Sequence, residues 1–237
     1  MESNIEVREK SEEEVTVSRD GHKLTEAEKK RVASFGLKEK ELLAKGYERH
    51  DLTISLLKAN VVGILLTLPF VAAFTVAYYF HNGGFGIRKL LDGNPVLYFI
   101  YLGILIVSFI PLAAIHELIH GLSWSVGSAN GMKDMEYGFQ KETVTPYCYC
   151  RSPLSKPVYI FGSLMPMTIL GIITGIVSVF LGNIVLLAIA VLQTIGGAGD
   201  ILVSVMLILY KTKGKDVILM DHPNECGLVV FEKAKDE

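Results

Sequence analysis

The hydrophobic and polar positions of this chain form polar ends around an apolar middle. Charged residues gather at the beginning of the chain, in two short loops and in the tail. Between them lie four apolar stretches with the roughly 20 residues that a helix needs to cross a hydrocarbon core of about 30 Å. These stretches are residues 60–80, 96–122, 158–181 and 184–210. The pattern predicts an all-α polytopic membrane protein with about four transmembrane helices.

The spans divide the chain into three parts. Residues 1–57 form a predicted cytoplasmic N-terminal extension of one or two short helices, with Thr25 and Glu28 spaced as a capping box. Residues 58–212 form the transmembrane core, and residues 213–237 form a cytoplasmic tail. The first part has no apolar segment of the kind that a removable signal peptide contains, so we expect none.

Two local patterns predict further detail. In the tail, apolar residues 217–220 and 228–230 flank a turn-like segment, which predicts a short C-terminal β-hairpin. In the third span, Gly171 and Gly175 are four residues apart, a spacing that predicts close packing against a neighbouring helix.

Basic residues near the ends of the spans predict the orientation in the membrane. They are frequent in the middle loop and at the start of the tail, whereas the opposite side has only Arg88 and Lys89. We therefore expect a multi-pass protein of the cell membrane with both termini in the cytoplasm. The formal net charge is −2, and the sequence has no concentrated basic patch. The predicted partners are therefore the lipid bilayer and a membrane-protein or peptide substrate, and not a nucleic acid.

The pentapeptide His116-Glu117-Leu118-Ile119-His120 lies inside the second span. Positions i and i+4 share one face of a helix, so the two imidazoles can bind one divalent metal ion. Glu117 is adjacent and can take a proton from metal-bound water. In a soluble protein such a match has an ordinary alternative, a pair of histidines satisfied within the core. At membrane depth, ionisable side chains are costly and persist mainly for function, which favours the metal site.

Asp200 is the best candidate for a third ligand. In a continuous fourth helix it would lie about 11 residues before the inner end, roughly 16 Å along the axis, whereas the histidines lie near that end of the second span. A local opening of the helix at the glycine-rich residues 196–199 would bring it closer. Its alternatives are pairing with a polar neighbour such as Gln193, or lining a water-filled cavity.

Three protein ligands and one open position are typical of catalytic zinc, unlike closed four-ligand structural sites. Zinc lowers the pKa of bound water towards about 7 and polarises a carbonyl group, while Glu117 acts as general base and then as proton donor. Two histidines and a carboxylate also hold iron in oxygenases. Because an oxygenase does not need the glutamate, the motif favours Zn²⁺ and hydrolysis of a peptide or amide bond.

These features resemble a known group. The histidine motif near the inner end of a span, with Asp200 in a glycine-rich late span, is similar to the site-2 protease clan of intramembrane zinc metalloproteases. More closely, residues 116–231, about half the chain, resemble the bacterial membrane family called putative zincin peptidases. The resemblance also rests on Tyr137-Gly138-Phe139, Pro146-Tyr147-Cys148-Tyr149-Cys150, Gly196-Gly197-Ala198-Gly199-Asp200 and Asp221-His222-Pro223.

The resemblance implies a protease that hydrolyses peptide bonds in or near membrane spans. It implies His116, His120 and Asp200 as zinc ligands and Glu117 as the catalytic acid and base. One departure concerns the third ligand, because Gly-Ala-Gly-Asp stands where many site-2 proteases have an Asn-Pro-Asp-Gly type of segment. Asp221 and the adjacent histidine are rival ligands by residue type, although they lack helical spacing and lie outside the apolar core.

Two other functions stay open at this point. One is a non-proteolytic scaffold or transporter-like membrane protein that binds metal, which would have no need of Glu117. The other is a metal-dependent hydrolase of a lipid or small amide, which would share the site and differ in what its groove admits. Cys148, Cys150 and Cys226 are odd in number and predicted to be cytoplasmic, so they indicate no disulfide framework and are interpreted as ordinary loop cysteines.

Overall fold

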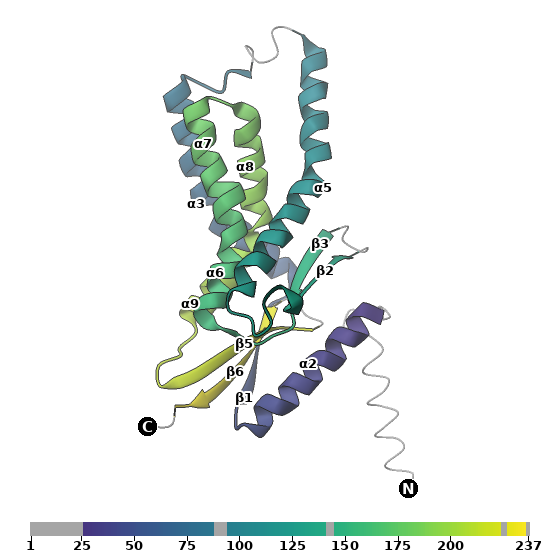
Figure 1. The fold of residues 1–237 in the computed structure, drawn as a ribbon. Helices are drawn as coiled ribbons and strands as arrows, with labels where there is room; N and C mark the ends of the chain where they lie inside the picture. Colours follow the sequence, from purple (N-terminus) through teal and green to yellow (C-terminus); the bar gives the residue numbers. More distant parts are fainter. Residues whose placement is uncertain (1–25, 88–93, 141–144, 224–226, 236–237) are drawn as a thin grey trace.

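The computed structural model describes residues 26–87, 94–140, 145–223 and 227–235. Long apolar helices form one end of the molecule, and a small sheet with a helix beside it forms the other (Figure 1). Several residues of the sequence predictions lie outside the described residues. They are Thr25 of the capping box, the basic pair Arg88 and Lys89, and Cys226.

Within the described residues, three helical stretches are long and apolar enough to cross a membrane. They are α3 (Leu56–Asn82), α5 (Pro95–Ser125) and the stretch Lys156–Leu181, which joins α6 (Lys156–Pro166), the π-helical η2 (Met167–Ile173) and α7 (Thr174–Leu181). Three such helices confirm the first three predicted apolar helices and are compatible with a multi-pass membrane protein.

The predicted fourth helix is broken. Helix α8 (Ile184–Gly196) and helix α9 (Ala198–Leu209) are bent by 47° relative to each other. Gly197 stands between them, and a Cβ atom at this position would lie 2.9 Å from the Cβ of Met167. A glycine therefore permits the corner to approach η2 closely. The break lies within residues 196–199, where a local opening of the helix was predicted, and a fourth crossing made by the bent pair stays a prediction.

The glycines of the third span lie against other helices, as predicted. A Cβ atom at Gly171 would collide with Thr194 of α8, and one at Gly175 would lie 2.8 Å from the ring of Phe74 of α3. The absence of side chains at these two positions lets three helices pack closely.

The predicted C-terminal hairpin is present as β5 (Lys215–Asp221) and β6 (Gly227–Ala234). It belongs to a larger antiparallel sheet of order β1-β6-β5-β4, in which β1 (Glu48–Thr53) comes from the N-terminal segment and β4 (Leu154–Ser155) from the middle loop. The prediction of an N-terminal segment made only of helices missed β1.

Both faces of this sheet are covered. Helix α2 (Glu26–Ala44) packs on one face, where Phe35 and Leu42 contact Phe231 and its neighbours in a buried cluster. On the other face, Leu228 and other strand residues pack against Trp124 of α5, Tyr159 of α6 and Leu207 of α9. The sheet therefore lies between α2 and one end of the apolar helices.

A second, two-stranded sheet follows α5 and was not predicted. After the 3₁₀ turn η1 (Gly131–Asp134), strand β2 (Met135–Gln140) pairs with β3 (Thr145–Cys150) in antiparallel register. Strand β3 lies against α5. The fold is mostly helical, and the description of it as all-α is corrected by these two sheets.

Candidate metal centre

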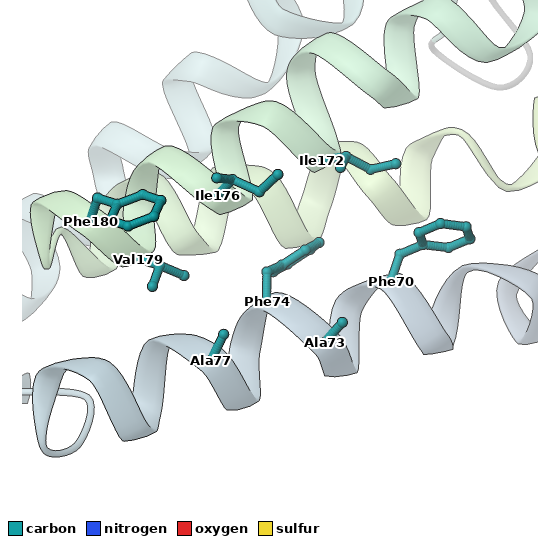
Figure 2. Close-up of a pocket in the computed structure, with 8 residues that line it drawn as sticks. All are labelled: Phe70, Ala73, Phe74, Ala77, Ile172, Ile176, Val179 and Phe180. Atoms are coloured by element: carbon teal, nitrogen blue, oxygen red, sulfur yellow. The ribbon is translucent and has the colours of Figure 1, made fainter.

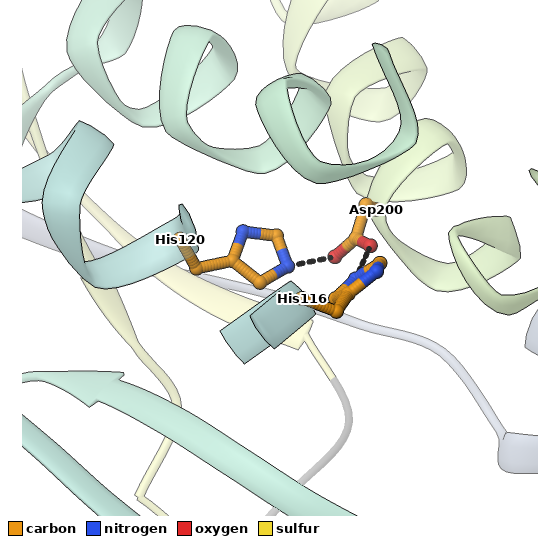
Figure 3. Close-up of side chains that lie close together, drawn as sticks. All are labelled: His116, His120 and Asp200. Carbon is orange, nitrogen blue, oxygen red and sulfur yellow. Dashed lines mark hydrogen bonds and ion pairs between the residues drawn. The ribbon is translucent and has the colours of Figure 1, made fainter. Parts of the chain in front are cut away.

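Three ionisable side chains converge where α5 meets α9. His116 and His120 lie one turn apart on α5, and both are buried. Asp200 lies in the first turn of α9. Its carboxylate is 3.1 Å from Nε2 of His116 and 3.3 Å from Nε2 of His120 (Figure 3). The structure thus brings together the three residues that the sequence singled out as metal ligands.

The break at Gly197 explains how Asp200 comes to this place. A new helix begins at Ala198, two residues before Asp200, and the first turn of that helix faces the end of α5. The polar partners of Asp200 are the two histidines rather than Gln193. The helix is therefore broken within the glycine-rich segment, where an opening was predicted.

His120 is held by the neighbouring helix α6. Its Nδ1 is 2.9 Å from the carbonyl oxygen of Gly162, and its ring stacks on Trp124 with centroids 4.8 Å apart. The indole Nε1 of Trp124 donates a hydrogen bond of 3.1 Å to the carbonyl oxygen of Tyr159. A Cβ atom at Gly162 would collide with the indole, so a glycine is required there. These contacts fix the plane and the tautomer of His120.

The tautomer of His120 determines whether the site can bind a cation. A carbonyl oxygen only accepts hydrogen bonds, so Nδ1 of His120 carries the proton and Nε2 presents a lone pair to Asp200 when the ring is neutral. Two acceptors at 3.3 Å repel each other unless a proton or a cation lies between them. The three ligand atoms all lie within 4.8 Å of one another. Ligands about 2.1 Å from a tetrahedral zinc ion are about 3.4 Å apart, so the donor set fits Zn²⁺.

Glu117 is half-buried beside these ligands and faces the β2–β3 hairpin. The backbone N–H of Cys148 in β3 donates a hydrogen bond to its carboxylate. Glu117 is not part of the group of three close ligand atoms. A carboxylate that neighbours the ligands without joining them is free to take part in proton transfer.

Residues 109–214 match the family model described as "Putative zincin peptidase". The matched segment contains both histidines, the glutamate and Asp200, but it is less than half of the chain and excludes α2, β1, α3, β5 and β6. Comparisons with curated proteins and with solved structures gave no match. The family match supports a zinc metallopeptidase as the general class of this protein and says nothing of its substrate.

Among the described residues, no cysteine belongs to the group of close metal-ligand atoms. Cys148 lies against Gly121 of α5 and hydrogen-bonds with the hydroxyl of Tyr137, while Cys150 is buried at the end of β3. Burial raises the pKa of Cys148 and raises that of Cys150 to about 12, so both stay protonated thiols at neutral pH. The two cysteines lie in a strand, not in a loop, and their protonation makes them poor ligands and weak nucleophiles.

The rival ligand Asp221 is engaged elsewhere. It is on β5, where its carboxylate accepts hydrogen bonds of 2.5 Å from the hydroxyl of Tyr159 and 3.1 Å from the backbone N–H of Cys150. Burial raises its pKa. It ties the sheet to α6 and β3, and neither it nor His222 belongs to the metal-ligand group.

Sequence reasoning missed the residues that support the ligands. Trp124 follows His120 by one helical turn, so the spacing of α5 offered a signal for it. The contributions of Gly162 and Cys148 are backbone groups, which no residue type reveals. They come from elements that reach α5 only through the tertiary fold.

A second group of metal-ligand types was also missed, on the sheet. Glu48 and His50 of β1 lie close to Glu232 of β6. The carboxylate of Glu232 already accepts hydrogen bonds from Lys215 and from the hydroxyl of Tyr210. The hydrogen bond from Lys215 lowers the pKa of Glu232. Because the ammonium group of Lys215 pairs with this carboxylate, we interpret Glu48, His50 and Glu232 as part of an ion-pair network.

A cavity of about 350 Å³ lies among the apolar helices, away from the ligands (Figure 2). Residues of α3, η2 and α7 line it, and all are apolar: Phe70, Ala73, Phe74, Ala77, Ile172, Ile176, Val179 and Phe180. It offers no group that could bind a metal or transfer a proton.

Proposed function

We propose that this protein is a zinc-dependent, membrane-embedded metalloprotease that resembles the site-2 proteases. His116, His120 and Asp200 are the proposed ligands of Zn²⁺, and Glu117 is the proposed catalytic acid and base. The observation that carries the proposal is the convergence of the three ligand atoms within 4.8 Å, with the glutamate beside them. The match of residues 109–214 to a zincin family model supports the same class.

Zinc, when bound, would act as a Lewis acid that lowers the pKa of a bound water and polarises the scissile carbonyl. Glu117 accepts the proton of the attacking water and passes it to the leaving nitrogen. His120 keeps its orientation through Gly162 and Trp124, and the N–H of Cys148 holds the glutamate towards the reacting groups.

The proposed substrate is a membrane protein or peptide, cut in or near a membrane span. The site lies on a helix compatible with crossing a membrane, and near the end of that helix that meets the two sheets. We place this end in the cytoplasm because the middle loop and the tail are rich in basic residues. Labelling of a Lys213→Cys variant in intact cells by a membrane-impermeant thiol reagent would contradict this orientation.

The test compares wild type with Glu117→Gln, both purified in detergent. We expect both to hold about one zinc per chain, and we expect Glu117→Gln to cleave a membrane-embedded peptide about 10² to 10⁴ times more slowly. Mass spectrometry of the products and elemental analysis of the protein measure the two quantities. Metal-loaded wild type that cuts no peptide would favour the metal-binding scaffold, and wild type without stoichiometric metal would overturn the site itself. Cleavage of a lipid or small amide instead of peptides would identify the other hydrolase class.

A further inference from the structure

The β2–β3 hairpin is held between two helices. Side chains alternate along a strand, so Cys148 points to one face of β3 while Tyr147 and Tyr149 point to the other. The face with Cys148 lies against Gly121 of α5, next to the proposed ligands. The face with the tyrosines lies under Arg31, which comes from α2.

Arg31 contacts this hairpin at three points. Its guanidinium carbon is 4.7 Å from the ring centroid of Tyr147 and 4.6 Å from that of Tyr149, within the range of cation–π attraction. Its Nη2 is 3.5 Å from Glu136 of β2, whose carboxylate also accepts hydrogen bonds of 2.8 and 3.0 Å from Arg151. One side chain of α2 therefore contacts both strands of the hairpin.

Helix α2 packs on the four-stranded sheet through residues other than Arg31. Phe35 and Leu42 of α2 are buried in a cluster with Phe231 and other residues of the four-stranded sheet. Arg31, in contrast, is a mostly buried cation whose Nε has no hydrogen-bond partner in the described part of the chain, an arrangement that costs stability. Within the residues that the structure describes, the polar and cation–π contacts of Arg31 are made to the hairpin and not to the four-stranded sheet, so its role differs from that of Phe35 and Leu42.

That role follows from what lies between its two tyrosines. Cys148 is flanked by Tyr147 and Tyr149, and its backbone N–H is the donor to Glu117. Fixing both tyrosine rings fixes the peptide unit between them. We propose that Arg31 is a positioning residue, through which α2 holds β3 against α5 and thereby keeps Glu117 oriented at the metal site. The inference deepens the proposed protease function and rests on it, and α2 lies outside the segment that matches the zincin family.

The test uses Arg31→Met, which keeps the apolar stem and removes the cation. Lys38→Met is the matched control, because Lys38 is a 44% exposed cation of the same helix, paired with Glu41. The first readout needs no activity: the rate at which N-ethylmaleimide alkylates Cys148, located by tandem mass spectrometry. The second is kcat and KM on a membrane-embedded peptide, and the third is the thermal midpoint.

We expect Arg31→Met to raise the alkylation rate of Cys148 about 10-fold, because release of the cation–π contacts lets the strand move away from α5. We expect kcat to fall about 10-fold with KM within about 2-fold, because a displaced base affects the chemical step and not binding. Arg31→Lys should restore most of both, since it keeps a cation over the rings. Lys38→Met should behave as wild type.

Each outcome tests one step of the proposal. An unchanged alkylation rate would overturn the hold of Arg31 on the hairpin, whatever the activity. Faster alkylation with wild-type kcat would overturn the positioning of Glu117. A loss of thermal stability in Arg31→Met with kcat unchanged would assign the residue a structural role. If wild type and Glu117→Gln both cut no peptide, the protease proposal fails by itself, and with it the catalytic role of Arg31, while alkylation still shows whether Arg31 holds β3.

Discussion

The two ends of α5 have opposite surroundings, although they belong to one continuous helix. In the half towards Val96, large apolar side chains are exposed, with 69% of Phe99 and 75% of Val107 accessible. In the half towards Ser125, the exposed fractions are 7% for His116 and 4% for His120. The first half contacts few other elements of the protein, and the second contacts α6, α9 and β3.

The difference shows what each half requires of its sequence. A helix face in contact with lipid needs only apolar side chains of sufficient total length, and it has no directional partner. The half towards Ser125 also carries the buried imidazoles of His116 and His120, which must each meet a specific partner, because an unpaired polar group in this environment is costly. We therefore expect equal substitutions in the two halves to differ sharply in effect.

The largest expected difference is in metal binding. We expect His120→Ala to lower the zinc affinity at least about 100-fold, because it removes one of three ligands, whereas Val107→Ala on the exposed half should leave it unchanged. Competition with a chromophoric chelator measures both affinities on purified protein. A similar loss in His116→Ala and Asp200→Ala would complete the ligand set, and retention of metal in any of the three would remove that residue from it.

The comparison also explains which features the sequence could predict. The apolar stretches of α3, α5 and α6–α7 are local patterns whose length is set by the thickness of a bilayer, so their positions could be predicted to within a few residues. The histidine pair was equally local, because it depends only on the period of a helix. Asp200 could be predicted as a candidate ligand because the glycines before it indicated a break in the helix.

The missed features depend on partners distant in the sequence. Residues Glu48–Thr53 have no alternation of apolar and polar residues, and they form β1 because β6 offers them a hydrogen-bonding edge. Strand β3 is covered on both faces, by α5 on the face of Cys148 and by Arg31 on the face of the tyrosines. The carbonyl group of Gly162 reaches His120 across 42 residues of sequence. Such contacts follow from tertiary packing and leave no local pattern.

The second expected effect is on stability, just beyond the buried end of α5. The carboxylate of Asp134 accepts hydrogen bonds from the hydroxyls of Ser128 and Ser152 and from the backbone and side chain of Asn130. We expect Asp134→Ala to lower the free energy of unfolding by about 3 kcal/mol, because several donors lose a charged acceptor. Lys133→Ala, in the same 3₁₀ turn, is the control and should change it by less than about 0.5 kcal/mol.

The contribution of Asp134 should also depend on pH. Burial raises the pKa of Asp134, but its hydrogen bonds lower it more, so the pKa in the folded state is below the ordinary value. The stabilisation is therefore complete above the unfolded pKa of about 3.9 and is lost as the pH falls below it towards the folded value. Thermal midpoints of wild type and Asp134→Ala should converge at low pH, and a constant difference across that range would contradict this account.

The smallest expected effect comes from adding one methyl group at a buried glycine and at an exposed one. A Cβ atom at Gly162 of α6 would collide with the indole of Trp124, whereas one at Gly103 in the exposed half of α5 would meet nothing within 4 Å. We expect Gly162→Ala to lower the free energy of unfolding by about 2 kcal/mol, because the indole must shift. Gly103→Ala should raise it by about 0.5 kcal/mol through helix propensity. Because Trp124 stacks on His120, Gly162→Ala should also weaken zinc binding about 10-fold, as loss of an orienting partner does. Equal stability and equal zinc affinity in the two variants would show that the buried end of α5 is as tolerant as the exposed end.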